Sequence, residues 1–333
     1  MRTTTDNSQA LSFWPKLTRP VRILAPMEDV TDTVFRRIIA ALGRPDVFFT
    51  EFTGASGMFG PKALEVRRRL RHTAVEKPLV AQIWGNNPDD YVAAARWLRQ
   101  HGFAGVDINM GCPKPKIIRR GYCSALIENR DLAKALILAA REGAGDLPVS
   151  VKTRTGVHTA VTEDWIGFLL ELKPDAITVH GRTADEMSDT VCDWDEIGLA
   201  VKLRDRISPE TAIIGNGDVT SLSELHERAA RYGVDGVMVG RGIFSNPALF
   251  SGGSFAELTP RERVRWMRRH FQLFRREWGR SRNYQELKKF VRVYASGFRG
   301  AEELTLAIMQ SESFEQGLAE IERFLGRYEC STC

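Results

Sequence analysis

Residues 105–116 read GVDINMGCPKPK, and this stretch decides the fold. It begins as an apolar strand and turns abruptly into glycine, cysteine, proline and lysine. In a parallel α/β protein such a change marks the carboxyl end of a strand, the edge where ligands bind. Asn109 and Cys112 stand at this edge and are candidate site residues. Taken alone, Cys112 also fits a buried structural cysteine before a proline turn, so the choice depends on the rest of the chain.

Short, nearly continuous apolar runs recur along the chain. Continuous rather than alternating hydrophobicity is typical of strands buried on both faces, as in parallel sheets. Helical spacing separates the runs, for example in residues 89–100. A doubly wound sheet is the alternative, but it rarely places eight parallel strands in sequence, so we predict an α/β fold of the (β/α)8 TIM-barrel type. The eight runs are residues 21–27, 47–52, 78–84, 105–110, 148–153, 176–180, 212–215 and 236–240.

Composition excludes several classes of protein. A chain of 333 residues with 43% hydrophobic content can bury one large core and a smaller one. There is no apolar run of about 18 residues, so we expect no membrane span and no membrane partner. Five scattered cysteines and a polar N-terminus favour a cytoplasmic protein without a disulfide framework. Cys330 and Cys333 form a C-x-x-C without a second pair, so we predict no metal site there.

Positive charge is concentrated near the C-terminus. Residues 251–300 contain 13 Arg and Lys against four Glu and no Asp, a local charge of +9 that leaves −4 for the rest of the chain. A basic segment attached to a mildly acidic body indicates a polyanionic partner. We therefore expect an N-terminal extension over residues 1–20, a barrel over 21–250 and a small C-terminal α-helical bundle over 255–328.

The C-terminal segment has a clear helix start. Thr259 is a candidate N-cap and Pro260 a first helical residue. The apolar residues that follow have helical spacing, which favours a packed core over a base-stacking platform: Val264, Met267, Phe271 and Phe274, with Tyr284, Phe290, Val293, Tyr294 and Phe298 expected in the next helix. Arg268, Arg275 and Lys288 were chosen from both helices as candidate phosphate contacts, since the outward face is not evident from the sequence.

Polar residues at the strand ends can be considered together, because all eight carboxyl ends meet at one mouth of a barrel. Glycines after the last two strands, with Arg241, form a candidate phosphate corner. Lys152 is either an ion-pair partner or an electrophile facing developing negative charge. His180 is either a core histidine or a ligand contact. The strand-end residues are Pro26, Met27, Glu28, Gln82, Asn109, Cys112, Lys152, Arg154, His180, Arg182, Asn216, Gly217, Asp218, Gly240 and Arg241.

Six of these segments, in this order and spacing, resemble the bacterial tRNA-dihydrouridine synthases. They are residues 25–32, 107–113, 151–154, 179–183, 215–218 and 239–242, and the resemblance extends from about Val21 to Phe250. It implies an FMN-binding TIM-barrel catalytic domain followed by a helical tRNA-binding domain. It also implies an oxidoreductase that reduces the C5–C6 double bond of specific tRNA uridines to 5,6-dihydrouridine, with NADPH or NADH as reductant and tRNA as partner. We expect a monomer.

The resemblance implies a role for each candidate residue. Reduced FMN would pass hydride to C6, and Cys112 would protonate C5 as the catalytic acid. The implied substrate contacts are Asn109, Arg154 and Arg182. The implied cofactor contacts are Pro26, Met27, Glu28, Gln82, Lys152, His180, Asn216, Gly217, Asp218, Gly240 and Arg241.

The chain departs from the family at two places. Cys123 stands where the family more often has glycine, which puts a second thiol near the mouth. Asp185 and Glu186 make acidic a loop that is usually basic there. Two other functions remain open: an FMN-dependent oxidoreductase of a small molecule, similar to dihydroorotate dehydrogenase, and a non-catalytic RNA-binding protein.

Overall fold

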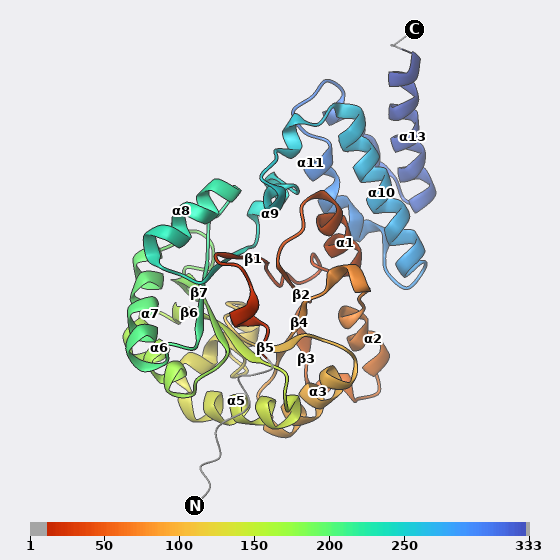
Figure 1. Ribbon diagram of the computed structural model, residues 1–333. Coiled ribbons are helices and arrows are strands. Elements are labelled where there is room, and N and C mark those ends of the chain that lie inside the picture. Colours follow the sequence, from red (N-terminus) through yellow and green to blue (C-terminus); the bar gives the residue numbers. More distant parts are fainter. Residues whose placement is uncertain (1–11, 331–333) are drawn as a thin grey trace, which may run out of the picture. The chain divides into compact units, whose positions relative to one another are not determined.

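The structure is a computed structural model that describes residues 12–330 (Figure 1). By its contacts the chain divides into two compact units. The first contains the described residues up to Thr33, with residues 45–219 and 223–240; the second contains residues 34–44, 220–222 and the chain from Arg241 onward. The expected N-terminal extension lies largely outside the described residues, as does Cys333.

The first unit is a closed barrel of eight parallel strands, which confirms the predicted fold class. β1 pairs with β2 and β9, and pairing between β2 and β4 closes the ring. The two-residue β3 pairs only with the end of β4. The strands are β1 (Val21–Leu24), β2 (Val47–Phe49), β3 (Thr53–Gly54), β4 (Leu79–Trp84), β5 (Gly105–Met110), β6 (Val149–Gly156), β7 (Ala176–Thr183), β8 (Ala212–Asn216) and β9 (Gly236–Val239).

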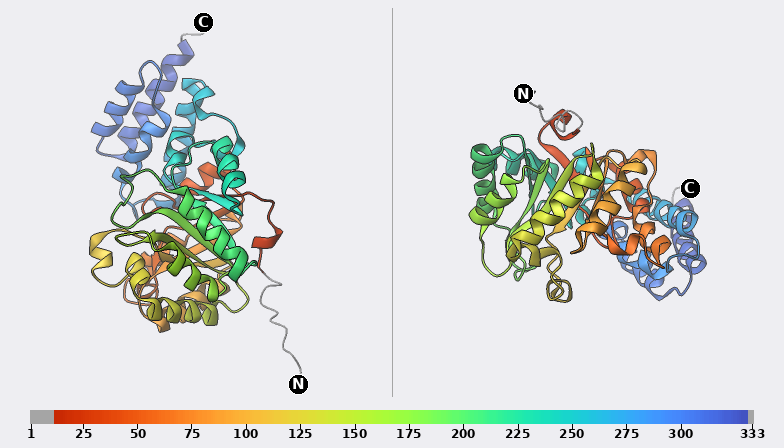
Figure 2. Two further views of the ribbon diagram at one scale, coloured as in Figure 1. Left: turned by 90° about the vertical axis from the view of Figure 1, so that its left-hand side faces the viewer. Right: turned by 90° about the horizontal axis from the view of Figure 1, so that it is seen from below.

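Helices surround the barrel strands on the outside (Figures 1 and 2). The predicted helix over residues 89–100 is confirmed as α3, with Asn87 as its N-cap. The helices between the strands are α2 (Ala63–Arg67), α3 (Pro88–Gln100), α4 (Pro115–Ile118), α5 (Arg130–Ala144), α6 (Thr162–Glu171), α7 (Trp194–Ile207) and α8 (Leu222–Tyr232). A 3-10 segment, η6 (Cys123–Glu128), precedes α5.

Buried apolar side chains fill the barrel interior. Ile23, Phe49, Val80, Ile214 and Met238 belong to this cluster and are almost fully buried. Trp14, from the short 3-10 segment η2 (Trp14–Lys16), packs into the same cluster and is 4% exposed. The chain just before β1 therefore completes the barrel core.

The second unit is helical. Its elements are α1 (Thr33–Leu42, from Val34), α9 (Gly242–Ser245), α10 (Pro260–Trp278), the 3-10 segment η9 (Tyr284–Phe290), α11 (Val291–Tyr294), α12 (Ala301–Gln310) and α13 (Phe314–Cys330). Thr259 is the N-cap of α10 and forms a capping box with Glu262, as predicted. The expected second helix was wrong as a single element: η9 and α11 divide it, and Phe298 lies beyond both.

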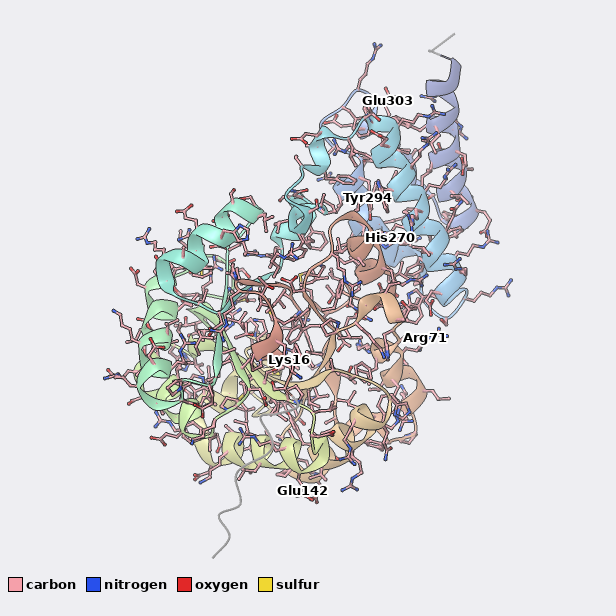
Figure 3. All side chains as sticks on the ribbon, viewed as in Figure 1. Lys16, Arg71, Glu142, His270, Tyr294 and Glu303 are labelled. Atoms are coloured by element: carbon pink, nitrogen blue, oxygen red, sulfur yellow. The ribbon has the colours of Figure 1, made fainter. Side chains whose placement is uncertain are left out.

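The predicted aromatic core of this unit is confirmed. Met267, Phe271 and Phe274 are buried along α10. His270 and Tyr294 face one another inside the unit, with 2.9 Å between His270 Nδ1 and the Tyr294 hydroxyl oxygen (Figure 3). Complete burial lowers the pKa of His270 to about 3, so this histidine is a neutral core residue.

Helices α3 and α5 approach closely at a glycine. A Cβ atom on Gly143 would lie 2.2 Å from the carbonyl oxygen of Val92. Gly143→Ala must push the helices apart, so we expect urea unfolding to show a loss of about 1–3 kcal/mol. Gly167→Ala in α6 is the matched control, because its Cβ would meet only Ile207 Cδ1 at 3.9 Å. There we expect no loss, or a gain of up to about 1 kcal/mol. Equal losses in both variants would contradict this packing.

Candidate active site

A cavity of about 340 Å³ opens at the carboxyl ends of the barrel strands. Its size is within the range of small-molecule sites. Six of the predicted site residues line it: Pro26, Glu28, Gln82, Asn109, Cys112 and Lys152. Phe52, Gly111, Pro113, Lys114 and Met187 complete the wall. Within residues 12–330, no group of three or more His, Cys, Asp or Glu side chains is placed to hold a metal ion.

A buried carboxylate organises the wall formed by β4 and β5. Asp107 Oδ2 accepts a 2.7 Å hydrogen bond from Gln82 Nε2, and Gln82 Oε1 accepts one of 3.0 Å from Asn109 Nδ2. Asn109 Oδ1 then accepts from the backbone N–H groups of Gly111 and Cys112, both at 3.0 Å. Gln82 and Asn109 thus connect Asp107 to the backbone of Cys112. Ser150 Oγ donates to Asp107 Oδ1 at 2.6 Å.

Lys152 lies across from Asn109 in the register of β5 and β6. Its Nζ donates to Asn216 Oδ1 at 2.9 Å, and Asn216 Nδ2 donates to the carbonyl of Met238 at 2.7 Å. Burial, followed by the charge of Arg154, lowers the pKa of Lys152 to about 8. Of the two alternatives for Lys152, the structure places no carboxylate in hydrogen-bond contact with its Nζ among the described residues. Its partner is the amide of Asn216.

Arg182 is buried and pairs with Asp218. Its Nε also donates to the carbonyl of Thr190 at 2.9 Å, and its Nη1 lies 3.1 Å from His180 Nε2. Asp218 Oδ2 accepts in addition from the Cys192 backbone N–H at 2.9 Å. Arg182 and Asp218 therefore hold the loop after β7, and the structure gives His180 a protein partner.

Arg154 is buried and donates to three carbonyls. Nε reaches Gly111 at 2.8 Å, while Nη1 reaches Thr183 at 2.7 Å and Met187 at 2.9 Å. Burial, with the nearby charge of Arg182, lowers the pKa of Arg154 to about 10. Arg154 thus joins the loops after β5 and β7 on the two sides of the mouth.

Cys112 is 9% exposed and Cys123 is 1% exposed, and neither forms a disulfide. A hydrogen bond from Cys123 is the largest influence on Cys112 and outweighs burial, so the pKa of Cys112 falls to about 6. Lys114 and Arg154 act in the same direction. The pKa of Cys123 is raised by this contact and by burial. The second thiol noted in the sequence is therefore a direct neighbour of the first.

The loop after β1 is held by its own side chains and by a distant arginine. Thr31 Oγ1 accepts from the Met27 backbone N–H at 2.9 Å, and α1 begins only at Thr33. Arg69 Nη2 donates to Glu28 Oε1 at 2.7 Å. Burial raises the pKa of Glu28 although the positive charge of Arg69 opposes this.

The predicted phosphate corner contains two different kinds of glycine. Gly217 has a φ of +140°, and a Cβ there would lie 2.2 Å from Cys192 Sγ, so the fold itself requires glycine. At Gly240 a Cβ would meet nothing closer than Ala25 Cβ at 3.8 Å and Met27 Sδ at 3.9 Å. Gly240 therefore leaves backbone accessible where packing does not demand it. Arg241 follows directly and is exposed.

The acidic loop after β7 is folded back on the barrel. Glu186 Oε2 accepts from the Thr183 backbone N–H at 2.7 Å, which lowers the pKa of Glu186. Asp185 Oδ2 lies 2.7 Å from His158 Nδ1. Met187 has a φ of +49°, is 41% exposed and lines the cavity. The departure in sequence is thus a local structure that places a methionine at the mouth.

Sequence reasoning missed Asp107, Ser150, Thr31, Arg69 and Met187. A signal existed for Asp107, because a single carboxylate between Val106 and Ile108 in a buried strand needs partners. The contacts of Arg69 and Met187 depend on loops that are far apart in sequence, so no local pattern indicates them.

Comparison with known proteins agrees with the geometry. A sequence profile described as dihydrouridine synthase (Dus) matches residues 23–328. The chain belongs to the dihydrouridine synthase family. It is 40% identical over 316 residues to a probable tRNA-dihydrouridine synthase of Staphylococcus aureus strain COL, covering 94% of this chain and 95% of that protein. It is 41% identical over 322 residues to probable tRNA-dihydrouridine synthase 2 of Bacillus subtilis strain 168, covering 95% and 98%.

Solved structures share the fold of this family member at low sequence identity. Histamine dehydrogenase from Rhizobium sp. 4-9 aligns with a TM-score of 0.53 at 14% identity, over 80% of this chain and 51% of that one. A 2-naphthoyl-CoA reductase complex with 2-naphthoyl-CoA aligns with a TM-score of 0.53 at 12% identity, over 69% and 49%. These similarities concern the fold alone.

The burial of Asp107 predicts a pH-dependent stability. Burial raises its pKa from 3.8 to about 6, so the native state retains a proton that the unfolded chain has released. The free energy of unfolding therefore falls as pH rises between about 4 and 6, by about 3 kcal/mol from this group. Asp107→Asn lacks this contribution. Urea unfolding of both proteins at pH 4 and pH 7 should show the wild-type advantage shrinking by that amount; a constant difference would contradict it.

Proposed function

We propose that this protein is a tRNA-dihydrouridine synthase that reduces the C5–C6 double bond of tRNA uridines. The proposal is supported chiefly by one observation: in a member of this family, Cys112 lines the same cavity as Lys152 at the mouth of the barrel. A thiol at this place is a proton donor, and a buried cation beside it favours developing negative charge. A tRNA substrate also fits the cytoplasmic location expected from the sequence.

Family membership supports a flavin cofactor, and we propose FMN with NADPH or NADH as reductant. The site fits such a group, because Gly240 leaves accessible backbone for a phosphate and Lys152 offers an ammonium to an electron-rich ring. Pro26, Met27 and Gln82 would contact the ring, while Arg241 would contact the phosphate. When bound, reduced FMN supplies the hydride for C6 of the uracil.

The protein's own residues would orient the base and move the proton. Cys112 donates its proton to C5. Asn109 fixes the backbone of Cys112 through Oδ1, so the thiol holds one position at the cavity wall. Asn216 keeps the ammonium of Lys152 in place, and Asp218 immobilises Arg182 and the loop beyond it. Asn216, Asp218, His180, Arg154 and Arg182 act in this scheme mainly by holding other groups.

Removing Cys112 separates acid catalysis from cofactor chemistry. We expect Cys112→Ala to retain FMN and oxidise NADPH at nearly the wild-type rate, while tRNA reduction falls by about 10²–10⁴-fold, the usual contribution of a positioned general acid. The measurement is dihydrouridine formed in unmodified tRNA transcripts, by mass spectrometry of nucleosides. Wild-type enzyme that oxidises NADPH but forms no dihydrouridine would favour the small-molecule oxidoreductase instead.

We further propose that the second unit binds tRNA through one face of α10. Arg265, Arg269 and Arg276 follow helical spacing, so they share a face, and all three are exposed. Arg268 and Arg275 lie on another face, where they pair with Glu322 at 3.2 Å and Glu315 at 3.3 Å on α13. Lys288 Nζ donates to the carbonyls of Met309 and Ser311, each at 2.7 Å. The three phosphate contacts chosen from sequence thus have partners within the unit.

Two pairs of substitutions on α10 test this face. Arg265→Gln with Arg276→Gln removes two charges that form no ion pair among the described residues, whereas Arg268→Gln with Arg275→Gln removes two paired charges. The first variant should flatten the dependence of log K on log salt for tRNA by about 1.4–1.8, at about 0.7–0.9 per lost phosphate contact. The second should change it little. Filter binding at several salt concentrations decides, and equal effects would mean that only overall charge matters.

A further inference from the structure

Two thiols meet at the cavity wall, and the proposed reaction uses only one of them. Cys112 lies in the loop after β5, and Cys123 begins η6 after α4. Both are buried, and they are hydrogen-bonded to one another through their side chains. Two polarisable thiols in contact away from water either share a proton or oxidise, so their arrangement carries a chemical consequence.

The surrounding structure holds both thiols in this contact. Cys123 has a φ of +54°, in the left-handed region that a residue with a Cβ enters only at an energetic cost. Ser124 Oγ donates to the carbonyl of Cys112 at 3.0 Å, so the start of η6 is tied directly to the Cys112 backbone. Asn109 fixes the N–H of Cys112 from the other side. The strained backbone and these two ties favour one geometry.

We propose that Cys123 is a positioning residue whose thiol donates a hydrogen bond to the sulfur of Cys112 and stabilises the thiolate that Cys112 becomes on giving up its proton. The inference rests on the proposed role of Cys112 as the acid at C5. In that step the S–H bond of Cys112 breaks and a C–H bond forms at C5 with the electron pair left by hydride addition at C6. The sulfur keeps the S–H electrons as a thiolate, and Cys123 keeps its own proton.

The groups around the pair act in the same sense. On the loop of Cys112, Lys114 contributes a backbone N–H and a positive charge; Arg154 and Lys152 on β6 add further positive charge. Tyr91 on α3 faces Cys123 and, like it, has a raised pKa. The proton of the pair therefore stays on Cys123 while Cys112 ionises, which is the arrangement that a donor from Cys123 to Cys112 requires.

The test measures the ionisation of Cys112 without relying on turnover. In the FMN-loaded protein, kept reduced by a phosphine, the rate of iodoacetamide alkylation of the Cys112 peptide is followed by mass spectrometry from pH 5 to pH 10. Cys123→Gly removes the donor and suits the positive φ. Cys123→Ser keeps a donor with a shorter reach. Cys192→Ser is the matched control, because Cys192 is a buried thiol whose Sγ donates to the Asn216 carbonyl instead.

The alkylation midpoint should rise by about 1–2 pH units in Cys123→Gly, the equivalent of one hydrogen bond to a charged group, and by less in Cys123→Ser. Cys192→Ser should leave it unchanged. The pH above which tRNA reduction declines should rise in parallel, because a weaker acid stays protonated further. An unchanged midpoint in a Cys123→Gly protein that melts like wild type overturns the inference, as does a shifted midpoint with an unaltered pH–rate profile. A shifted midpoint in a protein that never reduces tRNA overturns the proposed function instead.

Discussion

The carboxylate of Asp107 determines the direction of the hydrogen bonds along one wall of the site. An ionised carboxylate only accepts, so Gln82 must present its amide N–H to Asp107 and its oxygen to Asn109. Asn109 must then present its own oxygen to the backbone of Cys112. Each amide has a single orientation that satisfies its neighbours. The position of the reactive loop is therefore set by a charge two side chains away, inside the barrel.

This arrangement explains why a buried charge is retained in a strand where an apolar residue would pack. Burial opposes ionisation of Asp107, while hydrogen bonds from Ser150 and Gln82 and the charge of Lys152 favour it. A neutral amide in its place could donate as well as accept, and Gln82 and Asn109 could then adopt either orientation. The carboxylate thus contributes to a unique geometry at the expense of stability.

The sequence predicted the barrel because strands buried on both faces leave continuous apolar runs, and α10 because its cap and apolar stripe are local. It did not predict how candidate residues pair with one another. Asp218 and Arg182 are 36 positions apart, and Arg268 and Glu322 are 54 apart. Residues considered as separate ligand contacts therefore proved to be partners. The division of the second bundle helix into η9 and α11 was missed because a stripe of aromatic residues does not distinguish a 3-10 segment from an α-helix.

The balance of charge at the mouth follows from these pairings. Lys152, Arg154 and Arg182 all belong to the site, but only Arg182 has a carboxylate partner, Asp218, in direct contact. Arg154 is satisfied by carbonyls and Lys152 by an amide, so both retain uncompensated positive charge. The shifts agree with this excess, since Arg154 lowers the pKa of both Lys152 and Cys112. A site with this surplus favours any negative charge that forms beside it, on a bound ring or on the sulfur of Cys112. The carbonyl and amide partners thus preserve a field that carboxylates would have cancelled.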